Sequence, residues 1–202
     1  MPPTSEGWLR LSGVTALIAA MAVGLPYRLR AHRAGGAVPR RDEGLALAIG
    51  LRACAALWGL GFVLWLIDPG LMRWAEIPLP MPLRWLGAML LFLTVPLYRW
   101  VFHHLGLNLT DTVRARNQAT LVRTGPYRWV RHPLYSFGAL FVAGWALLTA
   151  NLWVAATSAI AAVLIVRRTA IEERFLIEKF GDDYRSYAAA TGRFFPRAGG
   201  RG

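Results

Sequence analysis

The chain has 202 residues, of which 55% are hydrophobic and 17% are charged. So apolar a composition argues against a soluble domain and favours several membrane spans. The formal net charge of +12 would suit a nucleic-acid-binding protein. However, the positive residues cluster in alternate connections between the apolar stretches, which argues against nucleic-acid binding.

The apolar stretches predict an all-α, polytopic membrane protein with about five transmembrane helices in a single membrane domain, residues 1–202. The expected spans are Trp8–Tyr27, Gly44–Ile67, Pro82–Leu105, Leu134–Ala150 and Leu152–Ala170. The first three form an N-terminal region, about residues 8–105. Little more than Asn151 separates the last two, which predicts a tight helical hairpin. Both are short for a span, so re-entrant geometry is also open.

Arginine residues gather in alternate connections between the spans. Segments 28–41 and 103–132 hold five arginines each and the tail after Val166 holds seven, whereas segment 68–81 holds only Arg73. This alternation fits the positive-inside rule with the N-terminus outside and the C-terminus in the cytoplasm. We therefore expect an integral protein of the bacterial inner (plasma) membrane that binds membrane lipids and no nucleic acid. The oligomeric state stays open.

The first span could instead be a signal peptide, with Leu11–Leu25 as its apolar region. Glu6 offsets Arg10 before this stretch, so a positive n-region is missing, and the arginines from Arg28 onward resist translocation. A retained span is the preferred interpretation.

Several features inside the spans have ordinary structural interpretations. Gly59-Leu60-Gly61 lacks the third glycine of a dinucleotide fingerprint and indicates helix packing. His103-His104 ends a span, and no metal site is expected because its neighbours do not have metal-ligand spacing. Arg52 either snorkels to an interface or lines an acceptor cavity. The single Cys54 excludes an intramolecular disulfide.

A first polar block, TGPYRWVRHPLY, precedes the fourth span at residues 124–135. Thr124-Gly125-Pro126 predicts a turn. Pro133 suits the first turn of a helix, so His132 is expected at a helix N-terminus, beside backbone donors that could bind an anion or polar ligand. A Pro helix start with arginines contacting lipid phosphates would explain the block equally well.

A second polar block, RRTAIEERFLIEKFGDDYRSY, follows the fifth span at residues 167–187. Arg168 and Glu172 are four residues apart and can meet on one helix face, although a solvated face would show the same pattern. Apolar residues continue at helical spacing to Phe180, and Gly181 suits a helix end. The hairpin returns this block to the first at one membrane face, and polar groups concentrated beside lipid indicate a functional site.

The ordered pattern GPYRWVRHPLY, apolar hairpin, R-x-x-x-E-E and F-G-x-x-Y-x-x-Y with a late Pro resembles the isoprenylcysteine carboxyl methyltransferase family and the related phospholipid methyltransferases. The resemblance covers residues 121–196. It implies a methyltransferase with cytoplasmic cofactor-binding segments, S-adenosyl-L-methionine as cofactor, and a hydrophobic or lipid-like acceptor that enters from the bilayer, similar to an isoprenylcysteine carboxylate.

The resemblance also implies roles for individual residues. Residues implied near the reacting carboxylate are Arg131, Arg168 and Glu173. Residues implied in cofactor binding are Gly125, Pro126, Tyr127, His132, Pro133, Tyr135, Glu172 and Glu173. Carboxylates suit ribose hydroxyls or an ammonium group, and arginines can orient an acceptor carboxylate.

Two other functions fit parts of the sequence. Membrane sterol reductases resemble the same C-terminal arrangement and bind NADPH, although this chain is short for their layout. A non-catalytic protein could use the basic cytoplasmic face to bind anionic lipid or a partner.

Overall fold

The computed structural model describes residues 4–33, 44–108 and 119–197, and every element in these ranges is helical. The helices, in chain order, are α1 (Ser5–Arg33), α2 (Leu45–Ile67), η2 (Pro69–Ala75), α3 (Met81–Leu105), η3 (Gly106–Asn108), η4 (Gly125–Arg128), α4 (Pro133–Thr149), α5 (Leu152–Phe180) and α6 (Asp182–Ala190).

The all-α membrane architecture is confirmed. Among the described residues, α1, α2, α3 and α5 are long and apolar enough to cross a membrane, and α4 is a shorter apolar helix of 17 residues. At 1.5 Å per residue, α4 extends for about 25 Å, which is slightly less than the hydrocarbon thickness. The protein is an integral membrane protein, and its described helices comprise four candidate spans with the shorter α4 packed among them.

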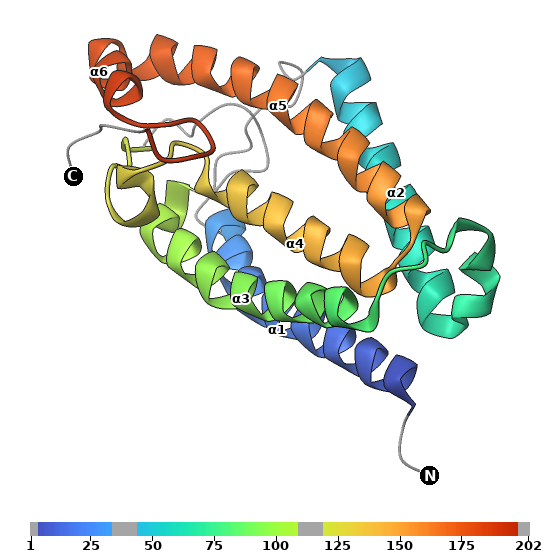
Figure 1. The fold of residues 1–202 in the computed structure, drawn as a ribbon. Helices are drawn as coiled ribbons and strands as arrows, with labels where there is room; N and C mark the ends of the chain where they lie inside the picture. The colour runs from blue at the N-terminus through green and yellow to red at the C-terminus, as the bar shows by residue number, and fades with distance from the viewer. Residues whose placement is uncertain (1–3, 34–43, 109–118, 198–202) are drawn as a thin grey trace.

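Helices α1, α3 and α4 lie side by side, while α5 diverges from α4 along its length and packs against α2 (Figure 1). Trp145 on α4 joins these groups because its ring is fully buried between α1 and α2. It meets Phe62 edge to face at 4.9 Å and Trp58 at 5.8 Å. Such aromatic pairs add packing energy beyond their burial, so Trp145 is the centre of the core.

Helices α3 and α4 approach each other backbone to backbone through Gly87 and Gly144. A Cβ atom at Gly87 would lie 2.5 Å from the Leu148 nitrogen and 2.6 Å from the Gly144 carbonyl oxygen. Only glycine permits this contact, which is the way small residues bring helices together in membranes.

The α4–α5 turn is as tight as the sequence predicts. Asn151 caps α5 by accepting hydrogen bonds from the Trp153 and Val154 backbone amides at 3.0 and 3.3 Å. Its side-chain amide donates to the Met72 carbonyl at 3.2 Å, which ties the turn to η2. Ala150 takes the left-handed conformation, with φ of 47°, to reverse the chain.

The helix ends extend beyond the predicted spans. Helix α1 continues through Pro26 to Arg33, and α5 continues to Phe180, where Gly181 stops it with φ of 56°. The α5 extension confirms the helical spacing of the second block. Residues 34–43 and 109–118, which include parts of the arginine-rich segments 28–41 and 103–132, lie outside the described residues.

The two glycines of Gly59-Leu60-Gly61 differ in their surroundings. A Cβ at Gly61 would lie 2.6 Å from the Trp153 ring, so this glycine serves helix packing as predicted. A Cβ at Gly59 would meet no atom of the described residues within 4 Å, so the packing interpretation fails for that position within the described part of the chain.

Candidate functional site

The two polar blocks meet at one end of the helix bundle, together with α6 and the C-terminal segment (Figure 1). Helix α4 starts at Pro133, so His132 stands at its N-terminus as predicted. Helix α5 returns from the Asn151 turn and carries Glu172 and Glu173 back to the level of His132. The hairpin therefore joins side chains about 40 residues apart in sequence.

Glu173 is the centre of the contacts between the blocks. Its Oε1 accepts a hydrogen bond from Arg131 Nε at 2.9 Å and lies 3.2 Å from His132 Nε2. Its Oε2 accepts a hydrogen bond from Arg193. Glu173 and His132 are 9% and 5% exposed, so the carboxylate is buried among nitrogen donors that compensate the loss of its hydration.

Arg131 joins three segments through one guanidinium. Besides the Glu173 contact, Nη1 donates to the Ala188 carbonyl at 2.9 Å and to the Thr191 carbonyl. The side chain thus fixes the start of α4 to α5 and to the end of α6. This geometry makes Arg131 a positioning residue in the structure, and its predicted contact with an acceptor carboxylate stays a prediction.

Glu172 forms a separate contact on the adjacent side of α5. Tyr135 donates its hydroxyl hydrogen to Glu172 Oε2 at 3.2 Å, and the Tyr135 and His132 rings stack with centroids 5.7 Å apart. Arg168 lies four residues before Glu172 on the same helix, where its charge acts on that carboxylate. The structure therefore brings together His132, Tyr135 and both glutamates.

The predicted Gly125-Pro126 turn forms the short helix η4, whose position depends on the end of α3. Gly125 has φ of 61°, and a Cβ there would lie 2.5 Å from the His104 ring. Pro126 and Tyr127 are buried, and the Tyr127 carbonyl accepts a hydrogen bond from the Tyr187 hydroxyl at 2.7 Å. The contact with His104 gives that histidine a packing role against the turn.

Residues 192–194 run beside the first block and complete the site. The amides of Arg131 and His132 donate to the carbonyls of Gly192 and Arg193 at 2.8 and 3.1 Å. Ser136 donates its hydroxyl hydrogen to the Phe194 carbonyl at 2.7 Å. Phe194 also packs on the His132 ring, with the ring centroids 6.0 Å apart.

Arg193 is the site residue that sequence reasoning missed. It stands 20 residues after Glu173, outside the helical periodicity that connects Arg168 with Glu172. The signal available in the sequence was a basic residue between the Y-x-x-Y pair and the late Pro. Sequence spacing could not pair Arg193 with Glu173, because the chain between the two residues turns at Gly181 and again after α6.

Tyr184 leaves a hydrogen-bonding group unused beside this network. Its side chain is 2% exposed, and its hydroxyl has no hydrogen-bond partner among the described residues. Burial raises the pKa of Tyr184, so the phenol stays protonated and can donate. Burial likewise raises the pKa of Tyr187 to about 12. Buried unpaired donors are rare, so the Tyr184 hydroxyl is a candidate donor to a ligand oxygen.

The donor set fits a ligand that carries hydroxyl and ammonium groups. Glu172 can accept from such groups, Tyr184 can donate to an oxygen, and Tyr135 and His132 offer ring faces. Within the described ranges, no group of three or more His, Cys, Asp or Glu residues comes together as a metal site would require.

The family model for phospholipid methyltransferase matches residues 83–183, which is half of the chain. The chain is 41% identical over 88 residues to the cobalt-zinc-cadmium resistance protein CzcN of Cupriavidus metallidurans, a match that covers 42% of this chain and 39% of that protein. It is 33% identical over 85 residues to the nickel-cobalt-cadmium resistance protein NccN of Alcaligenes xylosoxydans xylosoxydans, covering 42% of this chain and 40% of that protein. The matches thus span about two fifths of each curated relative.

The fold is also similar to that of a solved structure. The eukaryotic intramembrane Ras methyltransferase ICMT superposes on this chain with a TM-score of 0.51 and 20% identity, covering 76% of this chain and 53% of that chain. Its likeness confirms the fold, and the family match covers α3, η4, α4 and α5, which carry both polar blocks. This chain belongs to the phospholipid methyltransferase family of integral membrane proteins.

Proposed function

We propose that this protein is an S-adenosyl-L-methionine-dependent methyltransferase that methylates a lipophilic acceptor at the cytoplasmic membrane face. The observation that carries the proposal is the buried Glu173 carboxylate, which joins Arg131, His132 and Arg193 into one preorganised site. Family membership supports methyl transfer as the reaction. The placement of this site at the cytoplasmic face rests on the arginine-rich connections around it.

The cofactor would be held between the two polar blocks. Glu172 would accept hydrogen bonds from the ribose or amino-acid groups of the cofactor, and Tyr135 would donate to them. The Tyr184 hydroxyl would donate to a cofactor oxygen. The stacked His132 and Tyr135 rings would flank the ligand. S-adenosyl-L-methionine would supply a methyl group on its sulfonium sulfur. An acceptor oxygen, nitrogen or sulfur would bond to the methyl carbon as the carbon–sulfur bond breaks, and S-adenosylhomocysteine would leave.

Catalysis would depend mainly on position. Methyl transfer is a direct displacement, so no covalent intermediate with the protein is needed, and holding the partners in line is worth about 7–11 kcal/mol in favourable systems. Arg168 would orient an acceptor carboxylate, as an isoprenylcysteine-like acceptor would carry, while Arg131 and Glu173 keep the two blocks in place. The lipophilic part of the acceptor would reach the site laterally from the bilayer.

The test is calorimetric titration of the purified full chain with S-adenosylhomocysteine, with NADPH as the competing ligand. We expect saturable binding of S-adenosylhomocysteine and none of NADPH. Glu172→Gln removes the charge that would contact the ligand and is expected to weaken binding about tenfold, the cost of one charge-assisted hydrogen bond. Glu173→Ala is expected to abolish binding because it releases Arg131 and Arg193.

Glu178→Gln is the matched control, because Glu178 lies on the same helix and is exposed. Its affinity should equal that of the wild type. Well-folded protein that binds no S-adenosylhomocysteine, or that prefers NADPH, would refute the proposal. Wild-type affinity in both Glu172→Gln and Glu173→Ala would refute the assigned site.

A further inference from the structure

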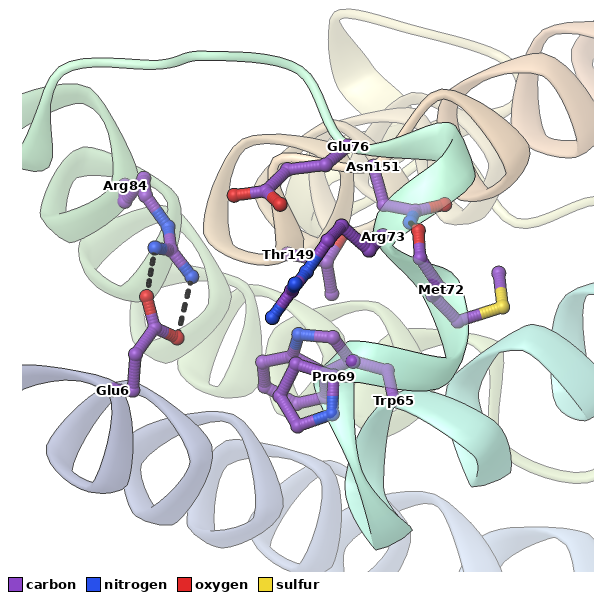
Figure 2. A pocket seen from close by; sticks show the side chains of 10 residues that line it. Glu6, Trp65, Pro69, Met72, Arg73, Glu76, Arg84, Thr149 and Asn151 are labelled. Carbon is purple, nitrogen blue, oxygen red and sulfur yellow. Dashed lines mark hydrogen bonds and ion pairs between the residues drawn. The ribbon is translucent and has the colours of Figure 1, made fainter.

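A second polar pocket lies at the end of the bundle away from the candidate site. It has a volume of about 190 Å³ and is lined by residues of α1, α2, η2, α3 and the α4–α5 turn (Figure 2). Thr149, which ends α4, belongs to this pocket, whereas His132 before the start of α4 belongs to the candidate site. The two places are therefore about 25 Å apart along the helix.

Two arginines and two glutamates line this pocket, and one arginine forms a salt bridge with one glutamate. Arg84, with 10% of its side chain exposed, donates Nη1 and Nη2 to the two carboxylate oxygens of Glu6. Its Nε donates to the Leu148 carbonyl at 3.1 Å. This bidentate pair fixes α1 to α3 and α4, and it leaves neither charge for a ligand.

The other two charged side chains, those of Arg73 and Glu76, are not paired with another described residue. Within the part of the chain that the structure describes, no hydrogen bond or ion pair engages the Arg73 guanidinium or the Glu76 carboxylate. Figure 2 shows the Arg73 side chain extending between Thr149 and Trp65 toward the salt bridge, with Glu76 beside it. The pocket thus presents one positive and one negative group that do not neutralise each other.

The side chains of Arg73 and Glu76 are exposed, and hydrogen bonds hold the backbone that carries them. The Glu76 amide donates to the Arg73 carbonyl at 3.1 Å, and the Ile77 amide donates to the Ala150 carbonyl at 2.7 Å. The Asn151 side chain holds the Met72 carbonyl. Both sides of the Arg73–Glu76 segment are therefore tied to the α4–α5 turn, which reduces the ordering cost of binding a ligand.

The surroundings place the pocket at the depth of lipid headgroups. Trp74 is 71% exposed and Leu71 50% exposed in the same short helix, and Leu152 at the start of α5 is 57% exposed. The Trp74 ring packs on Trp153 at 5.8 Å. Exposed tryptophan at the end of membrane spans marks the interface between hydrocarbon and water.

The charges also limit the chemistry of the ligand. Arg73 opposes a bound cation and Glu76 opposes a simple anion, while the paired Arg84 and Glu6 add no net charge to the pocket. A pocket volume of about 190 Å³ has room for a small headgroup. We propose that this pocket binds a zwitterion with a phosphate and a primary ammonium, as in a phosphoethanolamine headgroup, with Arg73 on the phosphate and Glu76 on the ammonium.

The test uses the purified full chain in mild detergent, with binding measured by native mass spectrometry. The probes are short-chain phosphatidylethanolamine, phosphatidylcholine and phosphatidylglycerol with the same acyl chains. We expect the tightest binding for phosphatidylethanolamine, because the choline headgroup cannot donate a hydrogen bond to Glu76 and the glycerol headgroup has no positive charge. Free phosphoethanolamine is added as a competitor. If it binds as tightly as the lipid, the site belongs to a soluble zwitterion.

Two variants separate the roles of the charges. Arg73→Gln should weaken phosphatidylethanolamine binding about tenfold, and Glu76→Gln should reduce the preference over phosphatidylcholine about tenfold. The matched controls Arg185→Gln and Glu178→Gln replace exposed charges at the other end of the bundle and should bind as the wild type does. Equal affinity for the three lipids, tighter binding of phosphatidylglycerol, or unchanged binding by Arg73→Gln would overturn the proposal.

Discussion

At the scale of single residues, Glu173 has more contacts than a surface pair would provide. An exposed ion pair contributes about 0–1 kcal/mol to stability. Removing a buried carboxylate costs more, because its hydrogen-bond donors are left buried and unpaired. Two of its partners, Arg131 and His132, belong to the first block, and Arg193 belongs to the C-terminal segment. The residue therefore links the two polar blocks to the C-terminal segment, and under the proposed function it would link ligand binding to folding of the site.

Glu173→Gln should lower the free energy of unfolding by about 3 kcal/mol, because the buried Arg131 guanidinium loses its counter-charge. Unfolding in mild detergent, titrated with a denaturing detergent and followed by circular dichroism, measures this change. Glu178→Gln should stay within about 0.5 kcal/mol of wild type. Equal stability of the two variants would contradict a central role for Glu173.

At the scale of elements, the site depends on how closely α3 and α4 pack. The family match includes both helices, and Gly87 and Gly144 let their backbones touch. This contact sets the position of His132 at the start of α4 relative to His104 at the end of α3. The Gly125 turn then fits onto the His104 ring.

Gly87→Ala should destabilise the protein by about 1–3 kcal/mol, because the new methyl group would meet backbone atoms that cannot move aside. Gly59→Ala is the matched control in α2, where a methyl group would meet no atom of the described residues within 4 Å. It should be neutral or stabilising by up to about 1 kcal/mol, since alanine favours a helix. The same detergent titration compares the two, and a similar loss in both would contradict the packing argument.

At the scale of the whole molecule, the chain has two polar ends with different electrostatics. The candidate site end carries most arginines, while the opposite end carries the balanced Arg73, Glu76, Arg84 and Glu6 pocket. From the positive-inside rule we expect the arginine-rich end to lie in the cytoplasm. The second pocket would then face the opposite leaflet, so the two sites would sample different lipids.

Cysteine labelling tests this orientation in cells. In a Cys54→Ser background, Pro78→Cys should react with a membrane-impermeant maleimide in intact cells, because Pro78 lies in an exposed connection at the second pocket's end. Glu178→Cys should react only after permeabilisation. The reverse labelling pattern would invert the topology.

The hydrophobic pattern alone determined the membrane class, the helices and the α4–α5 hairpin, because apolar length and helical period are local properties of the chain. The same local logic placed Pro133 at a helix start and Gly181 at a helix end. The resemblance to a family selected the residues of both blocks. Of these, the structure brings Arg131, His132 and Glu173 into direct contact.

Only the tertiary structure decided which charges meet. Arg193 joins Glu173 because α6 and the following segment fold back along the first block. Arg84 pairs with Glu6 across 78 residues, while Arg73 is not paired with another described residue although Glu76 is three residues away. Sequence spacing specifies pairs within one helix, but pairs between segments depend on the packing that buries one partner beside another, and that packing is a property of the whole fold.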